Sequence, residues 1–383
     1  MKKIIALTIA LALFACMFSA CSSKTAETSA PTEAETATSD ADQEKTGEDV
    51  AETPAEKVLI GWSANGLNGP NSHSDEVIKA YFADKDDVKL ISTNAELNAT
   101  QQIADIETLI EMGCSVIMLK PQDSTSLVNV LREAMDAGIT IILVEALVFD
   151  ANGEMVGDMY VGYDDVTIGR TLGEEVVKKA DGKPYNICIY EGQDGNTTFA
   201  TRLENFLEVI SAYDNIHILG QQSGPIGRSD DMRIAENFLS AYDTDINGIV
   251  TFTDESAIGA AMALDAEGYY DTVDVFTCNG TCEAMRYMID GGIDVLLALA
   301  SGSHPSVGIA YMIATGQATA EDFPESMYGG IKAVDVDLCE EYLSIAPNAY
   351  RMDDIDPKNN VLFTEPFSEW AKTYPAFENY PFE

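Results

Sequence analysis

The chain has 383 residues, 46% of them hydrophobic, and carries a formal net charge of −42 at pH 7. This length and composition allow about two domains of roughly 150 residues, each with a sizeable core. A surface this acidic repels nucleic acid phosphates and anionic lipid headgroups. We therefore expect no nucleic acid partner and no basic membrane-binding patch.

The first 20 residues have the pattern of a bacterial secretory signal. Two lysines precede an apolar stretch, Ile4–Phe18, which is too short to span a bilayer stably. The run Phe18-Ser19-Ala20-Cys21 resembles a lipobox, in which the new N-terminal cysteine carries diacylglycerol, although leucine is usual where Phe18 stands. We therefore expect a lipoprotein signal peptide at 1–20 and lipidation of Cys21. A cut before Cys16 and an ordinary signal peptide are the alternatives.

Residues 21–57 are rich in Ser, Thr, Ala, Glu and Asp and almost lack large apolar side chains. Such a segment cannot bury enough surface to offset the entropy of ordering, so we expect a disordered acidic tether. As a coil it would reach on the order of 30–36 Å. A diacylated Cys21 would be the only membrane attachment. We expect a monomer on the extracellular face of a bacterium that has a single bilayer.

From Val58 onward, short apolar strands alternate with amphipathic helices. In the first block we expect strands at 58–62, 88–91, 116–119 and 139–144. The helices between them should end in left-handed caps at Gly113 and Gly138. After Gly162 we expect strands at 185–190, 216–219, 246–252, 273–277 and 293–299, and helices near 198–212, 230–242, 255–267 and 281–290. The pattern predicts two α/β lobes with doubly wound parallel sheets, whose ligand site lies at the carboxyl ends of the strands.

Polar side chains gather at those strand ends and make candidate ligand contacts. They are Asn65, Asn68 and Asn71 after the first strand, Lys120 and Gln122 after the third, Glu145 after the fourth, and Thr253 and Asn279 in the second block. Amide and carboxylate groups suit bidentate hydrogen bonding of hydroxyls. Helix capping is the alternative role, which we expect for Ser124, Asp254 and Thr281.

Five cysteines follow Cys21, and most lie in apolar, strand-like surroundings: Cys114, Cys188, Cys278, Cys282 and Cys339. We expect buried thiols there. The spacing between Cys278 and Cys282 is not C-x-x-C and no histidine is near, so neither a metal nor a cofactor is expected. His73, at a helix start, should be solvated or capping rather than bind ligand. His217 should point outward from its strand.

Several segments, in this order, resemble ribose-binding-protein-type solute receptors of the type I periplasmic binding protein class. The resemblance covers about Val58–Gly316. It is carried by Lys120-Pro121-Gln122-Asp123-Ser124, Gly138–Ile142, Tyr160–Gly169, Thr201–Phe206, Thr253–Glu255 and Asn279–Thr281. The resemblance implies two lobes that are joined by three crossovers and close on a small polar ligand.

By that topology the first lobe takes residues 58–161 plus 303–325, and the second takes 162–302 plus 326–383. The end of the chain, 331–383, exceeds the family's compact core and is rich in aromatic residues, among them Trp370. We expect a strap that packs across the lobes, since so many exposed aromatics would form a large apolar patch. A partner surface is the alternative.

The resemblance also places ligand contacts on Lys120, Glu145, Arg202, Thr253 and Asn279, and on the loop after the first strand. Arg202 keeps the family's residue, but Gly69-Pro70-Asn71-Ser72 lacks the family's aromatic pair and Ala146 stands where it has arginine. Trp62 could compensate, although a core position is favoured. Lys120 and Glu145 could pair with each other or contact a charged or amino-bearing ligand. Pentose binding is therefore left open.

The function we expect is capture of a small sugar or polyol for the permease of an ABC importer. The alternative is a surface lipoprotein that senses an autoinducer-like or other small polar signal for a membrane receptor. We do not expect an enzyme, because the sequence has neither a G-x-S-x-G nor an H-E-x-x-H motif.

Overall fold

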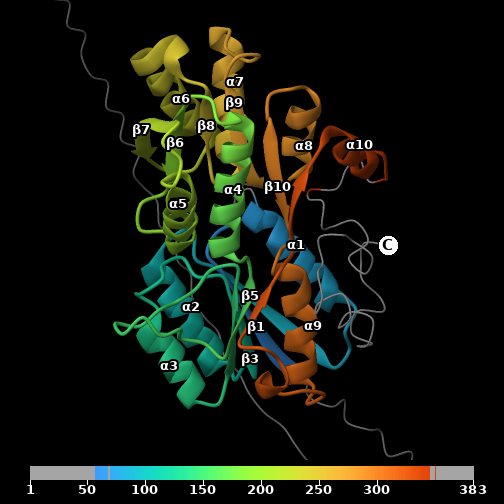
Figure 1. Ribbon diagram of the computed structural model, residues 1–383. Coiled ribbons are helices and arrows are strands. Elements are labelled where there is room, and N and C mark those ends of the chain that lie inside the picture. Colours follow the sequence, from blue (N-terminus) through green and yellow to red (C-terminus); the bar gives the residue numbers. More distant parts are fainter. Residues whose placement is uncertain (1–56, 68–69, 346–349, 351–383) are drawn as a thin grey trace, which may run out of the picture. The chain divides into compact units, whose positions relative to one another are not determined.

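The computed structural model describes residues 57–67, 70–345 and 350 (Figure 1). The expected signal peptide, Cys21, nearly all of the tether, Asn68 and Trp370 lie outside the described residues. Within the described part of the chain, no helix has both the length and the apolar character needed to cross a membrane.

The first sheet has six strands in the order β11-β5-β4-β3-β1-β2, and all neighbours are parallel. Its strands are β1 (Val58–Ala64), β2 (Val88–Asn94), β3 (Val116–Leu119), β4 (Thr140–Val144), β5 (Met159–Gly162) and β11 (Ser326–Tyr328). Its helices are α1 (Pro70–Ala83), α2 (Ala99–Glu111), α3 (Val128–Asp136) and α9 (Ser303–Ala314). Side chains of β3 alternate between two cores. Val116 and Met118 share one with α1 and α9, while Ile117 and Leu119 share the other with α2 and α3.

The second sheet has the order β12-β10-β9-β8-β6-β7, in which only β12 is antiparallel to its neighbour. Its strands are β6 (Tyr185–Gly192), β7 (Ile216–Ser223), β8 (Gly248–Val250), β9 (Asp274–Asn279), β10 (Val295–Leu299) and β12 (Ile331–Val334). Its helices are α4 (Asp165–Ala180), α5 (Thr197–Ile210), α6 (Arg228–Tyr242), α7 (Asp254–Glu267), α8 (Cys282–Ile289) and α10 (Val336–Ile345). Two short 3-10 helices, η1 (Asp243–Asp245) and η2 (Ala320–Asp322), complete the described elements.

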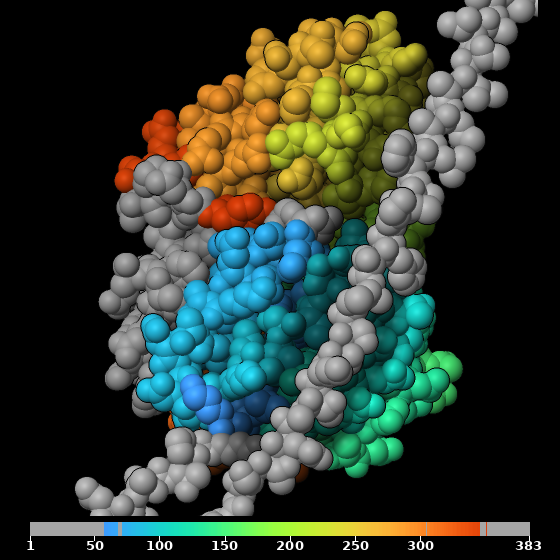
Figure 2. Space-filling model, turned by 180° about the vertical axis from the view of Figure 1, so that it is seen from behind, coloured from blue at the N-terminus to red at the C-terminus, as the bar shows by residue number. Residues whose placement is uncertain are grey.

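Helices cover both faces of the second sheet as well. Apolar residues of α4 and α5 pack on one face, and those of α6, α7 and α8 pack on the other. Figure 2 shows the atoms of α1 and α2, in blue and teal, gathered in one body and those of α6, α7 and α8, in yellow and orange, in another. The prediction of two doubly wound parallel-sheet lobes is therefore confirmed.

Most local expectations are also confirmed. Gly113 and Gly138 end α2 and α3 with φ values of 76° and 81°, in the left-handed region. The five cysteines that follow Cys21 are buried thiols, and His217 is exposed on its strand. Several strands differ in length from the expected ranges: β2 continues to Asn94, β7 continues to Ser223, and β8 is shortened to Gly248–Val250.

The chain passes between the sheets after β5, after β10 and between β11 and β12. These three crossovers touch one another. The Gly329 N–H donates to Gly162 O at 2.8 Å, and the Ala300 N–H donates to Gly330 O at 3.0 Å. A Cβ on Gly329 would lie 2.3 Å from Ala300 O, so a larger residue would push the crossovers apart. The expected boundary before residue 326 falls just ahead of β11, which pairs with β5 of the first sheet. The return to the second sheet therefore follows Tyr328.

Candidate functional site

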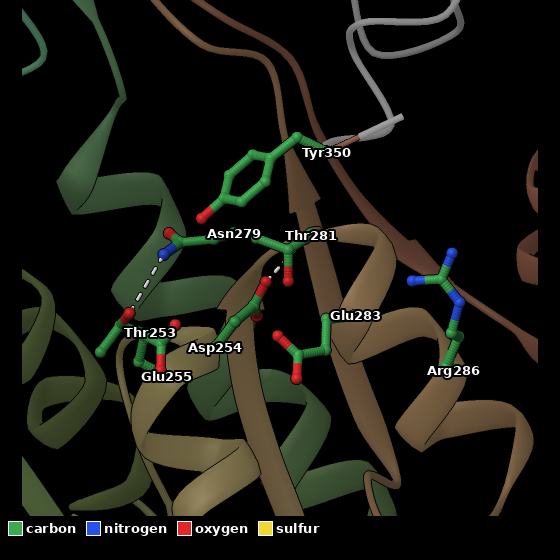
Figure 3. A pocket seen from close by; sticks show the side chains of 8 residues that line it. All are labelled: Thr253, Asp254, Glu255, Asn279, Thr281, Glu283, Arg286 and Tyr350. Carbon is green, nitrogen blue, oxygen red and sulfur yellow. Dashed lines mark hydrogen bonds between the residues drawn. The ribbon is translucent and has the colours of Figure 1, made fainter. Parts of the chain in front are cut away.

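A pocket of about 430 Å³ lies at the carboxyl ends of β8 and β9 (Figure 3). It is lined by Thr253, Asp254, Glu255, Asn279, Thr281, Glu283, Arg286 and Tyr350. Two of the sequence-predicted ligand residues meet in it, because Asn279 Nδ2 donates to Thr253 Oγ1 at 3.3 Å. This is the edge of a parallel α/β sheet at which ligands are expected to bind.

Asp254 and Thr281 fix the two loops that form the pocket. Thr281 Oγ1 accepts from the Ala284 N–H at 3.2 Å and caps α8, as expected. The expected capping role of Asp254 is wrong, because Asp254 is the first residue of α7 and its Oδ2 accepts from the Thr281 N–H at 2.7 Å. This carboxylate therefore ties the loop after β8 to the loop after β9 and is itself buried.

One wall of the pocket is acidic. Arg228 Nη2 lies 3.0 Å from Glu255 Oε2, and its Nη1 lies 2.8 Å from Glu283 Oε1. The guanidinium of Arg228 therefore pairs with both carboxylates. Arg286, which lies on α8, also lines the pocket. Carboxylates, amides and hydroxyls together offer both acceptors and donors to a ligand that carries hydroxyl groups.

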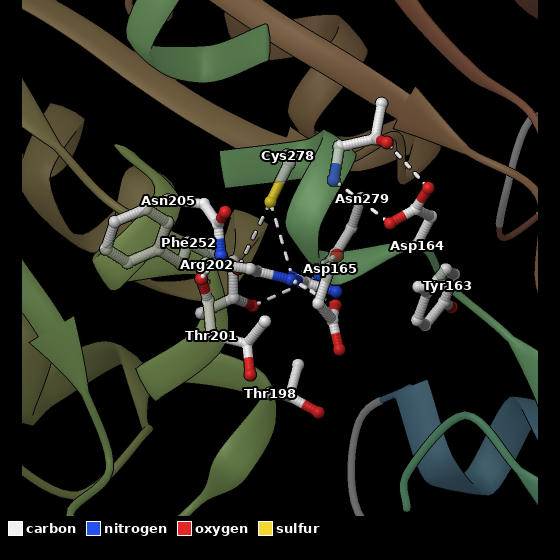
Figure 4. Close-up of polar contacts among 12 residues, drawn as sticks. Tyr163, Asp164, Asp165, Thr198, Thr201, Arg202, Asn205, Phe252, Cys278 and Asn279 are labelled. Carbon is white, nitrogen blue, oxygen red and sulfur yellow. Dashed lines mark hydrogen bonds and ion pairs between the residues drawn. The ribbon is translucent and has the colours of Figure 1, made fainter. Parts of the chain in front are cut away.

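Arg202 is not among the residues that line the pocket, and Figure 4 shows it among Asp165, Cys278 and Asn279. It is 3% exposed, and its Nε donates to Asp165 Oδ1, at the start of α4, at 2.8 Å. Its Nη1 donates to Phe252 O at 2.8 Å, to Cys278 Sγ at 3.3 Å and to Asn279 Oδ1 at 3.4 Å. Arg202 therefore donates several hydrogen bonds to other residues of the protein, and one of these bonds holds the side chain of Asn279.

Burial shapes the electrostatics of this ion pair. It raises the pKa of Asp165, although the guanidinium of Arg202 acts in the opposite direction. Arg202 also lies over the ring of Tyr163, with its Cζ 5.5 Å from the ring centroid. This buried guanidinium is held through Nε and Nη1, and removing it would leave Asp165 without its counter-ion.

Lys120 and Glu145 pair with each other, which was one of the two alternatives drawn from the sequence. Lys120 Nζ lies 2.6 Å from Glu145 Oε2, and the two side chains are 14% and 5% exposed. Glu145 Oε1 accepts hydrogen bonds from the hydroxyls of Ser301 and Ser303, which follow β10 at the second crossover. This pair is therefore built into the crossovers and does not line the pocket.

The other predicted contacts of the first lobe are held by their backbones or lie apart from the pocket. The Gln122 N–H donates to Gln102 Oε1 at 2.8 Å, and Asn65 O accepts from the Leu97 N–H at 2.7 Å. Among the described residues, Asn65 Oδ1 is buried and has no hydrogen-bond partner. Asn71 lies in the first turn of α1 and is half-buried. Among the predicted contacts, the structure therefore joins Arg202, Thr253 and Asn279 of the second lobe at the pocket, whereas in the first lobe it pairs Lys120 with Glu145 away from the pocket lining.

The expected capping role of Ser124 is wrong as well. Its Oγ lies 2.8 Å from Oγ1 of Thr197, the first residue of α5, so it links elements that belong to different sheets. The neighbouring Asp123 accepts from the N–H groups of Thr125 and Ser126 at 2.9 and 2.6 Å. These bonds, led by the one from Ser126, lower the pKa of Asp123.

Two aromatic residues differ in how well their roles could be predicted. Trp62 is fully buried and its Nε1 donates to Asp75 Oδ1 at 3.2 Å, which confirms the core position. His73 was expected to be solvated or capping, but it stacks on Tyr350 with ring centroids 4.7 Å apart. Sequence reasoning missed Tyr350, since it lies beyond every segment that carries the family resemblance. It also missed Glu283 and Arg286, for which only their position on the helix after Thr281 is a signal.

Within the described ranges, no group of three or more His, Cys, Asp or Glu side chains could hold a metal ion.

Known proteins are similar to this chain over most of its described part. The galactofuranose-binding protein of Escherichia coli is 26% identical over 241 residues, which cover 62% of this chain and 76% of the relative. The ribose import binding protein of the same organism is 26% identical over 216 residues, covering 56% and 70%.

Solved structures give the same result. An ABC transporter solute binding protein from Bacillus halodurans with bound myo-inositol superposes with a TM-score of 0.69 at 28% identity, over 77% of this chain and 99% of that one. A galactofuranose binding protein has the same TM-score at 22% identity and shows the likeness of fold. The family model for the periplasmic binding protein domain matches residues 68–319, so the chain belongs to the periplasmic binding protein family.

Proposed function

We propose that the protein is a solute receptor of an ABC importer and that it binds a small sugar or polyol at the pocket beside β8 and β9. The observation that carries this proposal is the convergence of Thr253, Asn279 and three carboxylates on one pocket at the carboxyl end of the second sheet. Two of the similar proteins are named for galactofuranose and ribose, and a third holds myo-inositol. All three compounds carry several hydroxyl groups. The pocket offers the donors and acceptors that such groups need.

Capture would proceed by closure of two lobes about the three crossovers. We assign to the first lobe residues 58–161, the returning helix α9 and β11, and to the second lobe residues 162–302 and the segment from β12 onward. The close contacts among Gly162, Ala300 and Gly329 support a hinge that bends only at the crossovers. A ligand that contacts both lobes favours the closed state by its differential affinity, and the permease would recognise that state. Binding and release need no bond to be made or broken, so we propose no catalytic activity.

We propose the cellular location of the protein from its sequence. The run that ends at Cys21 and the acidic segment after it support a lipid-anchored monomer on the extracellular face of the cell membrane, tethered by residues 21–57. In cell fractionation, a Cys21→Ala variant should leave the membrane fraction. Persistent membrane retention of the variant would contradict the lipid anchor.

A thermal-shift screen of the purified protein tests the binding function. The panel should contain galactofuranose, ribose, xylose, myo-inositol, amino sugars and, as a different class, amino acids. A sugar or polyol that binds should stabilise the folded protein by roughly 2.7 kcal/mol at a hundredfold excess over its Kd. A melting temperature that rises only with amino acids would contradict the proposal.

A further inference from the structure

Tyr350 lines the pocket although it is separated by many residues from every other lining residue. Its backbone oxygen accepts from the N–H of Cys282, the first residue of α8, at 2.9 Å. Figure 3 shows its ring beside Asn279 and Thr281, with the hydroxyl end directed toward Asn279. The backbone bond fixes Tyr350 to the second lobe, so its ring is a wall of the pocket.

The same ring contacts the first lobe. His73 lies on α1, and its ring stacks on that of Tyr350 with an interplanar angle of 26° and a centroid distance of 4.7 Å. Stacking of aromatic rings contributes about 0.5–1.5 kcal/mol beyond the burial of area. Tyr350 is therefore held from two sides, by a backbone hydrogen bond to α8 and by a ring from α1.

Among the described residues that line the pocket, Tyr350 is the one that presents a flat apolar surface. Apart from Tyr350, the lining consists of hydroxyl, amide, carboxylate and guanidinium side chains. A sugar or cyclic polyol presents hydroxyl groups at its edge and C–H groups on its ring faces. Hydrogen bonds satisfy the edge, but the C–H face is buried favourably only against an apolar or aromatic surface. The loop Gly69-Pro70-Asn71-Ser72, at the start of α1, offers no aromatic side chain.

We propose that Tyr350 is a ligand-contacting residue on whose ring the C–H face of the sugar or polyol packs, and that His73 is a positioning residue that holds this ring. The inference rests on the proposed sugar-binding function. It also predicts a specificity, because the flat ring of Tyr350 favours cyclic ligands over linear polyols that have the same number of hydroxyl groups. Because the ring of Tyr350 also contacts His73 on α1, closure of the lobes and the orientation of this ring depend on each other.

Four variants of the full-length protein test the proposal: Tyr350→Phe, Tyr350→Leu, His73→Ala and, as a matched control, Tyr213→Leu. Tyr213 is exposed and lines no part of the pocket. The probes are the ring sugar or cyclic polyol with the largest thermal shift in the wild type and a linear polyol such as xylitol, titrated calorimetrically. Circular dichroism establishes that each variant is folded.

We expect Tyr350→Phe to keep affinity for the cyclic probe within about threefold and Tyr350→Leu to lose about tenfold, the loss corresponding to one aromatic contact. His73→Ala should lose a smaller factor, and Tyr213→Leu should bind as the wild type does. Affinity for the linear polyol should change less than affinity for the ring. Unchanged affinity in folded Tyr350→Leu would overturn the proposal. Increased affinity would also overturn it, because Tyr350 would then occupy the ligand's place.

The stacking itself can be measured without any ligand. The chain has only three histidines, so the His73 ring protons can be assigned by their loss in His73→Ala. In wild type and Tyr350→Phe they should be shifted upfield by the neighbouring ring, and Tyr350→Leu should abolish the shift. An unshifted His73 signal in the wild type would overturn the positioning role. If no sugar or polyol binds the wild type, both the proposed function and the proposed ligand contact are wrong. If a sugar binds with an affinity that does not depend on Tyr350, only the inference about Tyr350 is wrong.

Discussion

The carboxyl ends of the two sheets each hold a buried ion pair, Lys120–Glu145 in the first and Arg202–Asp165 in the second. In both pairs, residues that the sequence predicts as ligand contacts form hydrogen bonds with other parts of the protein. Glu145 reaches Ser301 and the crossovers, whereas Arg202 reaches Asn279 and therefore the pocket. A charged residue near a strand end can therefore stabilise either the crossovers or the ligand site, depending on which neighbours accept or donate its hydrogen bonds.

Removing Arg202 should have the largest effect, because this guanidinium is almost fully buried. Arg202→Ala leaves Asp165 without its counter-ion, and we expect a loss of about 3–5 kcal/mol in the free energy of unfolding. Urea denaturation measures the loss. Arg170→Ala is the matched control, because Arg170 pairs with Glu208 while the two side chains are 46% and 60% exposed. That variant should lose less than about 1 kcal/mol. Equal losses in the two variants would contradict the account of Arg202.

Changing Glu145 should have an intermediate effect on stability. Glu145→Gln removes the charge that Lys120 faces but keeps an oxygen for the serine hydroxyls, so we expect a loss of about 2 kcal/mol. The double variant Lys120→Gln/Glu145→Gln should recover part of that loss, because no charge is then left buried without a partner. Both are measured by urea denaturation. A double variant that loses as much stability as Glu145→Gln, or more, would contradict this coupling.

Two side chains that accept hydrogen bonds from backbone N–H groups, Asp123 in the turn before α3 and Thr281 at the cap of α8, give the smallest effects and differ in their dependence on pH. Asp123→Ala and Thr281→Ala should each cost about 1 kcal/mol at pH 7. The backbone N–H of Ser126 lowers the pKa of Asp123 below its usual value of 3.8. Its stabilisation is therefore complete above the pKa of the unfolded chain and is lost as the pH falls through the lower folded pKa. The hydroxyl of Thr281 does not titrate in this range, so its cost should stay constant.

Denaturation from pH 7 down to the most acidic pH at which the protein stays folded separates the contributions of Asp123 and Thr281. The difference between wild type and Asp123→Ala should shrink in acid, while the difference for Thr281→Ala should not. A cost at Asp123 that does not change with pH would contradict the bonds assigned to its carboxylate.

The architecture could be predicted from the sequence because it depends on local patterns. Short apolar runs such as Val116–Leu119 have no polar face and are typical of strands covered on both sides. Gly113 and Gly138 end their helices since they adopt left-handed conformations cheaply. The third crossover was placed too early because β11 is a three-residue strand, and its choice of sheet depends on pairing with β5 rather than on its own sequence.

The site could be predicted only where its geometry is also local. Thr253 and Asn279 follow neighbouring strands and meet at one sheet edge. Asp254 and Ser124 were expected to cap helices, but each bonds a residue that is distant in sequence, at Thr281 and Thr197. Tyr350 reaches the pocket from outside the two strand and helix blocks, and no local pattern indicates such a contact.

The most direct test of the central claim is a calorimetric titration of the wild type and Asn279→Ala with the sugar or polyol that gives the largest thermal shift. Asn279 faces the pocket, where it bonds Thr253, and its loss should leave a ligand hydroxyl without its partner. We expect Kd to rise about tenfold or more, well beyond the change in Glu145→Gln. An Asn279→Ala variant that is folded and binds as tightly as the wild type would contradict the placement of the ligand at the second sheet.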